Sequence, residues 1–182
     1  MGYSAMKLTW FGGTAVRVHA GGSILVIDPQ TAAAPVRLTE MASGADLVLR
    51  SDDPDLPVLD QERWRPQRRG RLLDAAGSPP VELFRWGKNS ILIAAAAEPQ
   101  LGLLAPNDTV PDGRWAEDAV LVMFGLPFVW IEGGLLERLR PRLLALAMPD
   151  EKLDAALDAL RPHLAEGDIG LVTLEPEMAV EL

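Results

Sequence analysis

The sequence predicts a single domain of the α/β (α+β) class, residues 1–182, in which short strands outnumber helices. The chain has 182 residues, a length at which one compact domain with a substantial core is the usual outcome. Its 16 Gly and 15 Pro exceed the usual share and indicate many short elements joined by turns. The clearest helical pattern begins only at Asp150, so most of the apolar sequence falls in short, strand-like runs.

The N-terminal part of the chain predicts strands separated by glycine turns. Apolar residues alternate over 7–18 around Gly12-Gly13, which predicts two strands with a turn or bulge between them. The β-rich run 23–28 follows a second Gly-Gly pair and predicts a hairpin. One or two helical turns are expected over 35–43, and a buried strand over 45–50.

The middle of the chain predicts a second hairpin, across Gly87-Lys88-Asn89, and then further short strands. The expected strands are 81–86, 90–95, 101–105, 119–124, 128–131 and 143–148, with one or two helical turns over 135–140.

The clearest helix begins at Asp150, which is a good N-cap directly after Pro149. Apolar residues follow at helical spacing, so one stripe of the helix faces a core. Pro162 is expected to end or kink this helix near Leu160, because proline lacks the amide hydrogen that the helix interior uses. Two strands, 169–174 and 178–182, are expected to close the chain.

Charge and composition argue against several classes of function. The net charge of -9 disfavours nucleic acids and membrane surfaces as partners, because both are anionic. No run approaches the roughly 18 apolar residues of a membrane span, and the start lacks the features of a signal peptide. We therefore expect a cytoplasmic protein with no membrane or nucleic-acid partner. The absence of Cys excludes a disulfide framework, a thiolate zinc site and an iron–sulfur cluster.

Three segments of the N-terminal part follow a familiar order. They are Met6-Lys-Leu-Thr-Trp-Phe-Gly-Gly13, Ile24-Leu-Val-Ile-Asp-Pro29, and Ala45-Asp-Leu-Val-Leu49 with a polar loop after it. This order resembles the opening of the metallo-β-lactamase superfamily, in the branch of zinc-dependent hydrolases that includes sugar-lactone hydrolases. In that branch, strands ending in Trp-Leu-Gly-His and Ile-Asp-Pro precede the metal loop Thr-His-x-His-x-Asp-His.

Weaker similarities continue along the chain. Asn107-Asp108-Thr109 resembles the Gly-Asp-Thr of the family, whose aspartate bridges two metal ions. Residues 140–148 resemble the strand before the last histidine ligand, and 172–182 resemble the closing hairpin. The resemblance implies a metallo-β-lactamase-like αββα sandwich, two mixed β-sheets flanked by helices, with any site at a sheet edge.

The departures from the family pattern fall on the metal ligands. Gly13 replaces the first histidine, Pro149-Asp150 replaces the last, and the metal loop becomes Ser51-Asp52-Asp53-Pro54-Asp55-Leu56-Pro57. The only two histidines, His19 and His163, match no ligand position, and Asp108 alone keeps its residue type. We interpret the matching positions as a vestigial site without catalytic residues, zinc or another cofactor. Its residues are Gly13, Asp52, Asp53, Asp55, Asp108 and Asp150.

The acidic loop leaves an alternative open. Asp52, Asp53, Asp55 and Asp108 could form an all-carboxylate site for Mg²⁺, Mn²⁺ or Ca²⁺ in a metal-dependent hydrolase. The opposing interpretation is a solvated turn whose Asp side chains accept hydrogen bonds from their own backbone. Asp28, in the Ile-Asp-Pro segment, is interpreted as a structural carboxylate that satisfies loop amides near the site.

A basic segment is the second candidate site, because 62–71 holds five Arg in an otherwise acidic chain. Guanidinium groups bind phosphate and carboxylate bidentately, and an aromatic ring adds apolar surface. The predicted anion or partner patch comprises Arg63, Trp64, Arg65, Arg68, Arg69 and Arg71. The alternative is a solvated loop, or Arg side chains paired with the acids of the protein itself.

The leading functional hypothesis is a degenerate metallo-β-lactamase-fold protein that binds no zinc. It would serve as a non-catalytic binding, regulatory or structural protein. Its partner would be a small molecule or a protein, and we expect a homo-oligomer.

Overall fold

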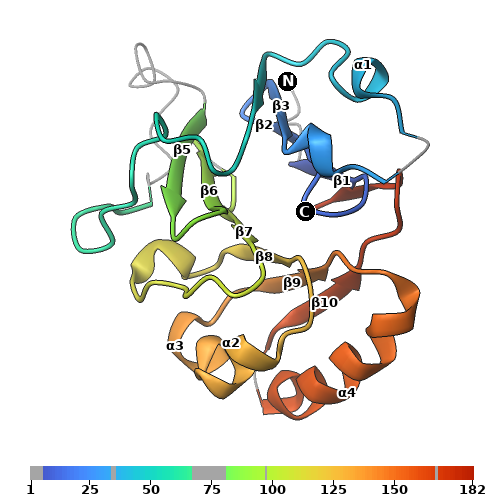
Figure 1. Cartoon of the computed structure of the whole chain (residues 1–182). Coiled ribbons are helices and arrows are strands. Elements are labelled where there is room, and N and C mark those ends of the chain that lie inside the picture. The colour runs from blue at the N-terminus through green and yellow to red at the C-terminus, as the bar shows by residue number, and fades with distance from the viewer. Residues whose placement is uncertain (1–5, 34–35, 67–80, 97, 167) are drawn as a thin grey trace.

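Two β-sheets pack face to face in this chain (Figure 1). The computed structural model describes residues 6–33, 36–66, 81–96, 98–166 and 168–182. The N-terminal sheet has five strands in the order β11-β1-β2-β3-β4, and the second sheet has six in the order β10-β9-β8-β7-β6-β5.

The N-terminal sheet is built mainly from the apolar runs that the glycine pairs separate. Its strands β1, β2 and β3 are antiparallel, β4 is parallel to β3, and β11 is antiparallel to β1. Gly21 and Gly22 join β2 to β3 with φ of 57° and 81°, a turn conformation that glycine adopts at little cost. The strands are β1 (Lys7–Trp10), β2 (Val16–Ala20), β3 (Ser23–Ile27), β4 (Leu47–Leu49) and β11 (Ala179–Glu181).

The second sheet is antiparallel from β5 to β7 and parallel from β7 to β10. Every residue of β6, β7 and β8 is buried, which explains why these strands are almost continuously apolar. The strands are β5 (Val81–Trp86), β6 (Ser90–Ala95), β7 (Leu101–Leu104), β8 (Val120–Met123), β9 (Leu143–Leu146) and β10 (Gly170–Thr173).

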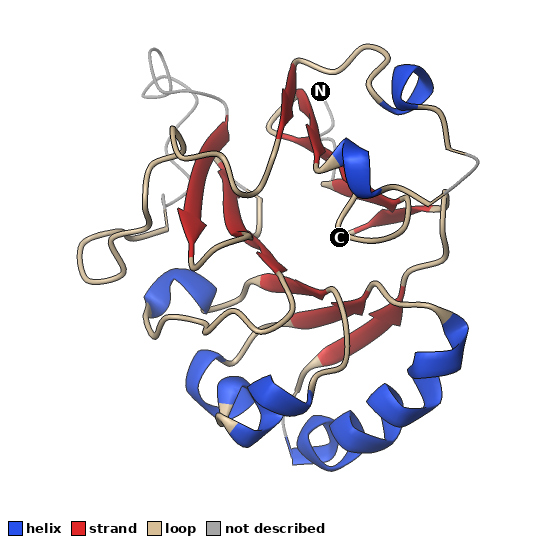
Figure 2. Cartoon of the chain, in the orientation of Figure 1, coloured by secondary structure: helices blue, strands red, loops and turns tan. Residues whose placement is uncertain are grey.

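The main core lies between the sheets, where Leu8 and Ile27 of one sheet belong to the same cluster as Ile93 and Val122 of the other. Alternate residues of the second sheet, such as Leu121, face its outer side and pack under helices. Figure 2 shows these helices together on that side. They are α2 (Phe128–Glu132), α3 (Leu135–Leu139) and α4 (Asp150–Glu166).

The outer side of the N-terminal sheet has a thinner cover. The single turn α1 (Leu38–Met41) buries Met41 against Ala15 and Val26. Two short 3-10 turns, η1 (Pro29–Thr31) and η2 (Arg114–Ala116), lie in connections between strands. The layers are therefore helix, sheet, sheet and helix, and the predicted αββα sandwich with two mixed sheets is confirmed.

Three predicted elements need correction. The prediction of a strand over 128–131 is wrong, because these residues begin α2. A four-residue apolar run has no diagnostic period, and here Trp130 turns inward while Phe128 and Val129 stay exposed. The strand over 45–50 exists as β4, but it is an edge strand with only Leu49 buried.

The third correction concerns the end of α4: the helix does not end near Leu160 but continues to Glu166 with Pro162 inside it. Proline removes one amide donor, so the carbonyl of Asp158 loses its helical partner. Because Asp158 lies on the exposed side of the helix, water can satisfy that carbonyl.

The strand directions place the connecting loops at two opposite edges of the sandwich. β1, β3 and β4 end at the same edge as β7 to β10, because the amide of Glu177, in the β10–β11 connection, donates to the carbonyl of Trp10 at 2.7 Å. We call this edge the carboxyl edge and the other the amino edge. No helix among the described residues is both long and apolar enough to span a membrane.

One carboxylate joins the two sheets at the amino edge. Glu98, between β6 and β7, accepts a hydrogen bond from the amide of Gly21, in the β2–β3 turn, at 3.1 Å. The second carboxylate oxygen of Glu98 is buried without a hydrogen-bond partner. Burial raises the pKa of Glu98 above its ordinary value, and the Gly21 amide offsets part of that rise.

We predict that Glu98→Gln flattens the pH dependence of folding stability. A raised folded-state pKa means that the folded protein holds this proton more tightly than the unfolded chain. The native chain therefore loses stability as pH rises from the ordinary glutamate range through the folded-state pKa, whereas the neutral amide does not titrate. Urea unfolding across this range should show the variant gaining on the native chain as pH rises. Glu132→Gln, on an exposed residue, is the control, and equal pH profiles for both variants would contradict this assignment.

Candidate functional site at the carboxyl edge

All residues of the predicted vestigial site lie at the carboxyl edge, in loops or, for Asp150, at the start of a helix. Gly13 follows β1, the acidic loop follows β4, Asp108 follows β7 and Asp150 begins α4 after β9. The topology therefore brings the matching loops to one edge, as the resemblance implies. The side chains themselves have separate local partners.

Loops of the N-terminal sheet meet at Asp28 on this edge. Asp28 is buried, with only 3% of its surface exposed. Its two oxygens accept hydrogen bonds from the amide and hydroxyl of Ser51 at 2.7 and 2.6 Å, and from the hydroxyl of Thr14 at 2.8 Å. Asp28 has φ of 51°, a left-handed conformation that aspartate tolerates better than most residues. The interpretation of Asp28 as a structural carboxylate is confirmed.

Ser51 has a role that its sequence position did not reveal. Its hydroxyl donates to Asp28 and is buried, so it is oriented as a structural donor rather than as a free nucleophile. A serine two residues after one strand and a carboxylate directly after the neighbouring strand are the sequence signal for such a pair, because parallel strands end at the same edge.

The Gly12-Gly13 turn fits closely against the end of η1 and the residues that follow it. Gly12 and Gly13 have φ of 94° and 53°. A Cβ atom on Gly13 would lie 2.5 Å from the carbonyl oxygen of Thr31, and one on Gly12 would lie 2.7 Å from the Cβ of Ala33. Both positions therefore require glycine, and the place where the family has its first histidine has no room for a side chain here.

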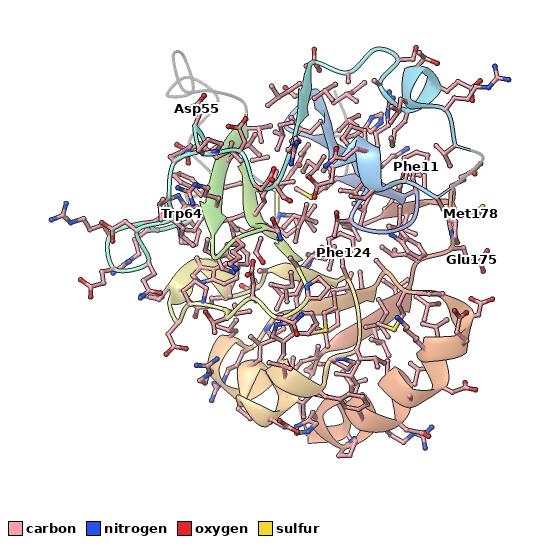
Figure 3. All side chains as sticks on the ribbon, viewed as in Figure 1. Phe11, Asp55, Trp64, Phe124, Glu175 and Met178 are labelled. Carbon is pink, nitrogen blue, oxygen red and sulfur yellow. The ribbon has the colours of Figure 1, made fainter. Side chains whose placement is uncertain are left out.

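The acidic loop is a solvated turn with its own partners. Asp52 forms a bidentate pair with Arg50, at 2.8 and 2.6 Å, and this hydrogen-bonded guanidinium lowers the pKa of Asp52. Asp53 accepts a hydrogen bond from the amide of Asp55 at 2.9 Å, which closes an Asx turn. The side chain of Asp55 points away from the molecule at its surface (Figure 3).

Apolar side chains occupy the space beneath this loop. Leu56 stands where the family motif has its aspartate, and it packs against the core between the sheets. Phe124, at the end of β8, belongs to the same cluster and is 5% exposed. Figure 3 shows Phe124 near the centre of the view, between the two sheets.

Asp108, the one matched ligand position that keeps its residue type, caps the β5–β6 turn. Its carboxylate accepts hydrogen bonds from the amides of Lys88 and Asn89, at 3.1 and 2.9 Å, and from the hydroxyl of Ser90 at 2.9 Å. The carbonyl of Asp108 also accepts from the indole of Trp130 at 3.2 Å. The carboxylate of Asp108 therefore holds the β5–β6 turn in place.

The residues present do not fit the zinc ion that the family pattern implies. Gly13, Pro54 and Leu56 carry no metal-binding atom, and Asp52 and Asp108 are engaged with other groups. Within the described part of the chain, no three His, Asp or Glu side chains approach closely enough to share a metal ion. The alternative site of Asp52, Asp53, Asp55 and Asp108 is thus not assembled. Asp150 is exposed at the start of α4.

The two histidines lie away from the carboxyl edge. His19, near the end of β2, accepts a hydrogen bond from Arg17 at 3.3 Å, and its partial burial lowers its pKa. His163, on α4, lies 2.8 Å from a carboxylate oxygen of Glu137 on α3. Both have structural contacts, and neither joins the predicted site.

The basic segment is described only as far as Pro66. Arg63 lies 3.6 Å from Asp60, and Arg65 donates to the neighbouring carbonyl of Trp64 at 2.7 Å. Trp64 packs edge-on against Phe84 with ring centres 6.0 Å apart, so its ring supports β5. Arg68, Arg69 and Arg71 lie outside the described residues.

Solved structures share this architecture at low sequence identity. Igni18, a metallo hydrolase from the hyperthermophilic archaeon Ignicoccus hospitalis, is 16% identical with a TM-score of 0.55. The alignment covers 98% of this chain and 99% of that one. This chain has the metallo-β-lactamase fold. No family model and no curated protein sequence matches it.

Two further structures are similar. A mutant of the CmlA β-hydroxylase is 10% identical with a TM-score of 0.53, and this chain aligns over its whole length with 55% of that chain. A putative Zn-dependent hydrolase of the metallo-β-lactamase superfamily from Thermotoga maritima is 16% identical, with a TM-score of 0.49 over 93% of this chain and 99% of that one.

We predict that Asp28→Ala destabilises the fold strongly. The change leaves the buried Ser51 amide without its acceptor and places alanine at a left-handed φ, which together should cost about 2–4 kcal/mol. Urea unfolding measures the loss. Asp55→Ala, exposed in the neighbouring loop after β4, should change stability by about 0.5 kcal/mol or less. An equal effect of the two substitutions would contradict the structural role of Asp28.

A second prediction concerns the close contact between Asp108 and Gly87. A Cβ on Gly87 would lie 2.7 Å from the Asp108 carboxylate, and Gly87 has φ of 59°. Gly87→Ala should therefore cost more than Gly44→Ala, whose φ of 68° is similar but whose Cβ would meet no atom within 4 Å. In an Asp108→Ala background, the cost of Gly87→Ala should fall towards that of Gly44→Ala. A double-mutant cycle by urea unfolding tests this, and strict additivity would refute the contact.

Proposed function

We propose that this protein is a non-catalytic member of the metallo-β-lactamase fold, which acts by binding a small molecule or a protein. The fold is that of metallo-hydrolases, and the finer assignment rests on what occupies the ligand positions. At the carboxyl edge, hydrogen bonds and apolar packing hold the loops in place. In the zinc-dependent hydrolases that the sequence resembles, the matching loop positions carry metal ligands.

The hydrogen bonding of Asp108 carries this proposal. A metal-bridging carboxylate must present its oxygens to the ions, but here they accept from two backbone amides and one hydroxyl of the β5–β6 turn. Releasing Asp108 for a metal ion would leave those donors to find other acceptors. Moving the Asp108 carboxylate from these donors to a metal ion would therefore cost about 1–3 kcal/mol. Metal binding at a site without histidine ligands would have to offset that cost.

Metal analysis of the purified protein tests the proposal. We expect less than stoichiometric zinc, manganese or iron by elemental analysis, and no rise in melting temperature with millimolar Zn²⁺, Mg²⁺, Mn²⁺ or Ca²⁺. An ion that binds only the folded state would raise the melting temperature by mass action. Stoichiometric metal that is lost on Asp108→Asn would overturn the proposal and support the all-carboxylate hydrolase. Asp112→Asn, on an exposed residue of the same loop, is the control.

Self-association is part of the same proposal. The edge strand β4 exposes Leu47 and Val48, at 41% and 49%, and its outer side has no strand partner among the described residues. Exposed apolar edge strands are common sites of strand addition. Sedimentation equilibrium of the native chain and of Val48→Lys measures the oligomeric state directly.

A further inference from the structure

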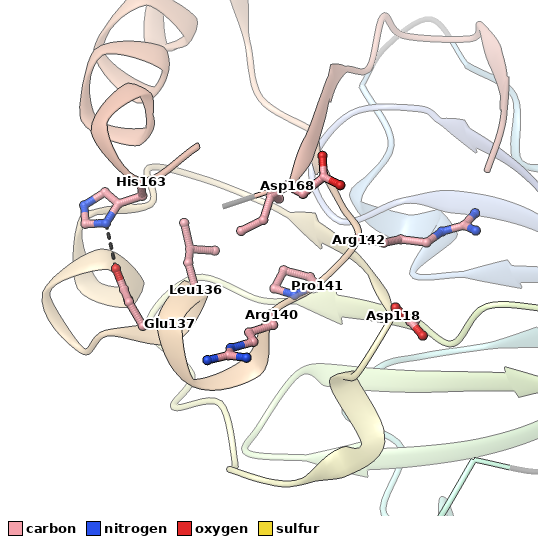
Figure 4. A pocket seen from close by; sticks show the side chains of 9 residues that line it. Asp118, Leu136, Glu137, Arg140, Pro141, Arg142, His163 and Asp168 are labelled. Carbon is pink, nitrogen blue, oxygen red and sulfur yellow. Dashed lines mark hydrogen bonds and ion pairs between the residues drawn. The ribbon is translucent and has the colours of Figure 1, made fainter. Parts of the chain in front are cut away.

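A cavity of about 660 Å³ opens at the amino edge, on the opposite side of the sheets from the vestigial site. It lies between the start of β8, the segment from α3 to β9, and the segment from α4 to β10 (Figure 4). Leu136, Pro141 and Ile169 supply its apolar part. The volume falls within the range of small-molecule binding sites.

Charged groups of both signs line this cavity without pairing with one another. Arg140 and Arg142 form no ion pair with any described residue, and neither do Asp118 and Asp168. Glu137 and His163, in the same lining, lie 2.8 Å apart, and this contact joins α3 to α4. Elsewhere on the surface some arginines pair with nearby acids, as Arg50, Arg114 and Arg138 do, and others, such as Arg37, form no ion pair with a described residue.

The unpaired charges are separated along the cavity. Figure 4 shows the carboxylates of Asp118 and Asp168 on one side of Pro141, and the guanidinium of Arg140 on the other side, towards Glu137. The side chain of Arg142 points away from that of Arg140, to the side of Pro141 on which the two aspartates lie (Figure 4). One end of the cavity thus holds two aspartates and Arg142, and the other holds Arg140 beside Glu137, whose carboxylate already contacts His163.

The backbone holds two of these charged residues in an unfavourable conformation. Asp118 and Arg140 have φ of 61° and 47°, and left-handed backbone costs a residue with a side chain about 1 kcal/mol or more. Arg140 follows the last turn of α3, where glycine is the common residue. The fold therefore presents an arginine side chain at a position where a glycine would be less strained.

We propose that this cavity binds a small zwitterionic ligand, an amino acid derivative or dipeptide that carries one carboxylate and one ammonium group. The carboxylate would pair with Arg140, because guanidinium binds carboxylate bidentately. The ammonium group would lie at the Asp118 and Asp168 end, and an apolar side chain would contact Leu136 and Ile169. A purely anionic ligand would meet those two aspartates, and a purely cationic one would meet the arginines, so a dipolar ligand matches the lining best.

Three forms of one dipeptide test the proposal by isothermal titration calorimetry. Leucyl-glycine carries both charges, its N-acetyl form lacks the ammonium group, and its C-terminal amide lacks the carboxylate. We expect the free dipeptide to bind at least about tenfold more tightly than either blocked form. Amide NMR shifts should change for residues 118, 136–140, 142 and 168–169, which localises binding to the amino edge.

Matched variants complete the experiment. Arg140→Gln should weaken binding of the free dipeptide about tenfold, and Asp118→Asn should weaken it similarly, because asparagine tolerates left-handed backbone and keeps the fold. Arg37→Gln, on an exposed residue beside α1, should leave binding unchanged. Equal affinity for the three dipeptide forms, or the absence of saturable shifts at the cavity residues, would overturn the proposal. The metal analysis above has no bearing on this result, so the two proposals fail independently.

Discussion

The buried Asp28 carboxylate is the interaction on which the carboxyl edge depends. It lies at the end of β3 and binds Ser51 at the end of β4 and Thr14 in the β1–β2 turn, so three chain segments meet at two oxygen atoms. A buried carboxylate is costly unless its oxygens accept hydrogen bonds, and here donors from neighbouring loops supply them. These hydrogen bonds hold the start of the loop after β4 against the end of β3.

The same reasoning explains why the fold persists although the ligand pattern does not. The strands of the sandwich are stabilised by apolar packing between the sheets and under the helices, which does not involve the edge loops. At the edge, Leu56 and Phe124 add to that packing, and Asp108 fixes the β5–β6 turn. Positions that the resembling family uses for chemistry thus serve local stability in this chain. Fold and chemistry are separable because they use different atoms.

Much of this could be predicted from the sequence, and the exceptions have physical causes. The strands with clear alternation, the helix from Asp150 and the role of Asp28 followed from local pattern. The helix at Phe128–Glu132 did not, because its four-residue apolar run has no period and only tertiary burial of Trp130 decides it. The direction of the Asp108 side chain could not be predicted either. It depends on the close approach of Gly87, twenty-one residues away, and no spacing rule encodes that contact.

The two edges of the sandwich differ in how their charges are satisfied. At the carboxyl edge, Asp28, Asp52, Asp53 and Asp108 all accept hydrogen bonds from the chain itself. At the amino edge, the cavity groups Arg140, Arg142, Asp118 and Asp168 have no such partners among the described residues, and two of them sit on strained backbone. Because these charged groups have no partner among the described residues, a ligand with complementary charges would add interactions that the described chain does not make itself. The place to look for recognition in this protein is therefore the edge opposite the one that the family resemblance indicates.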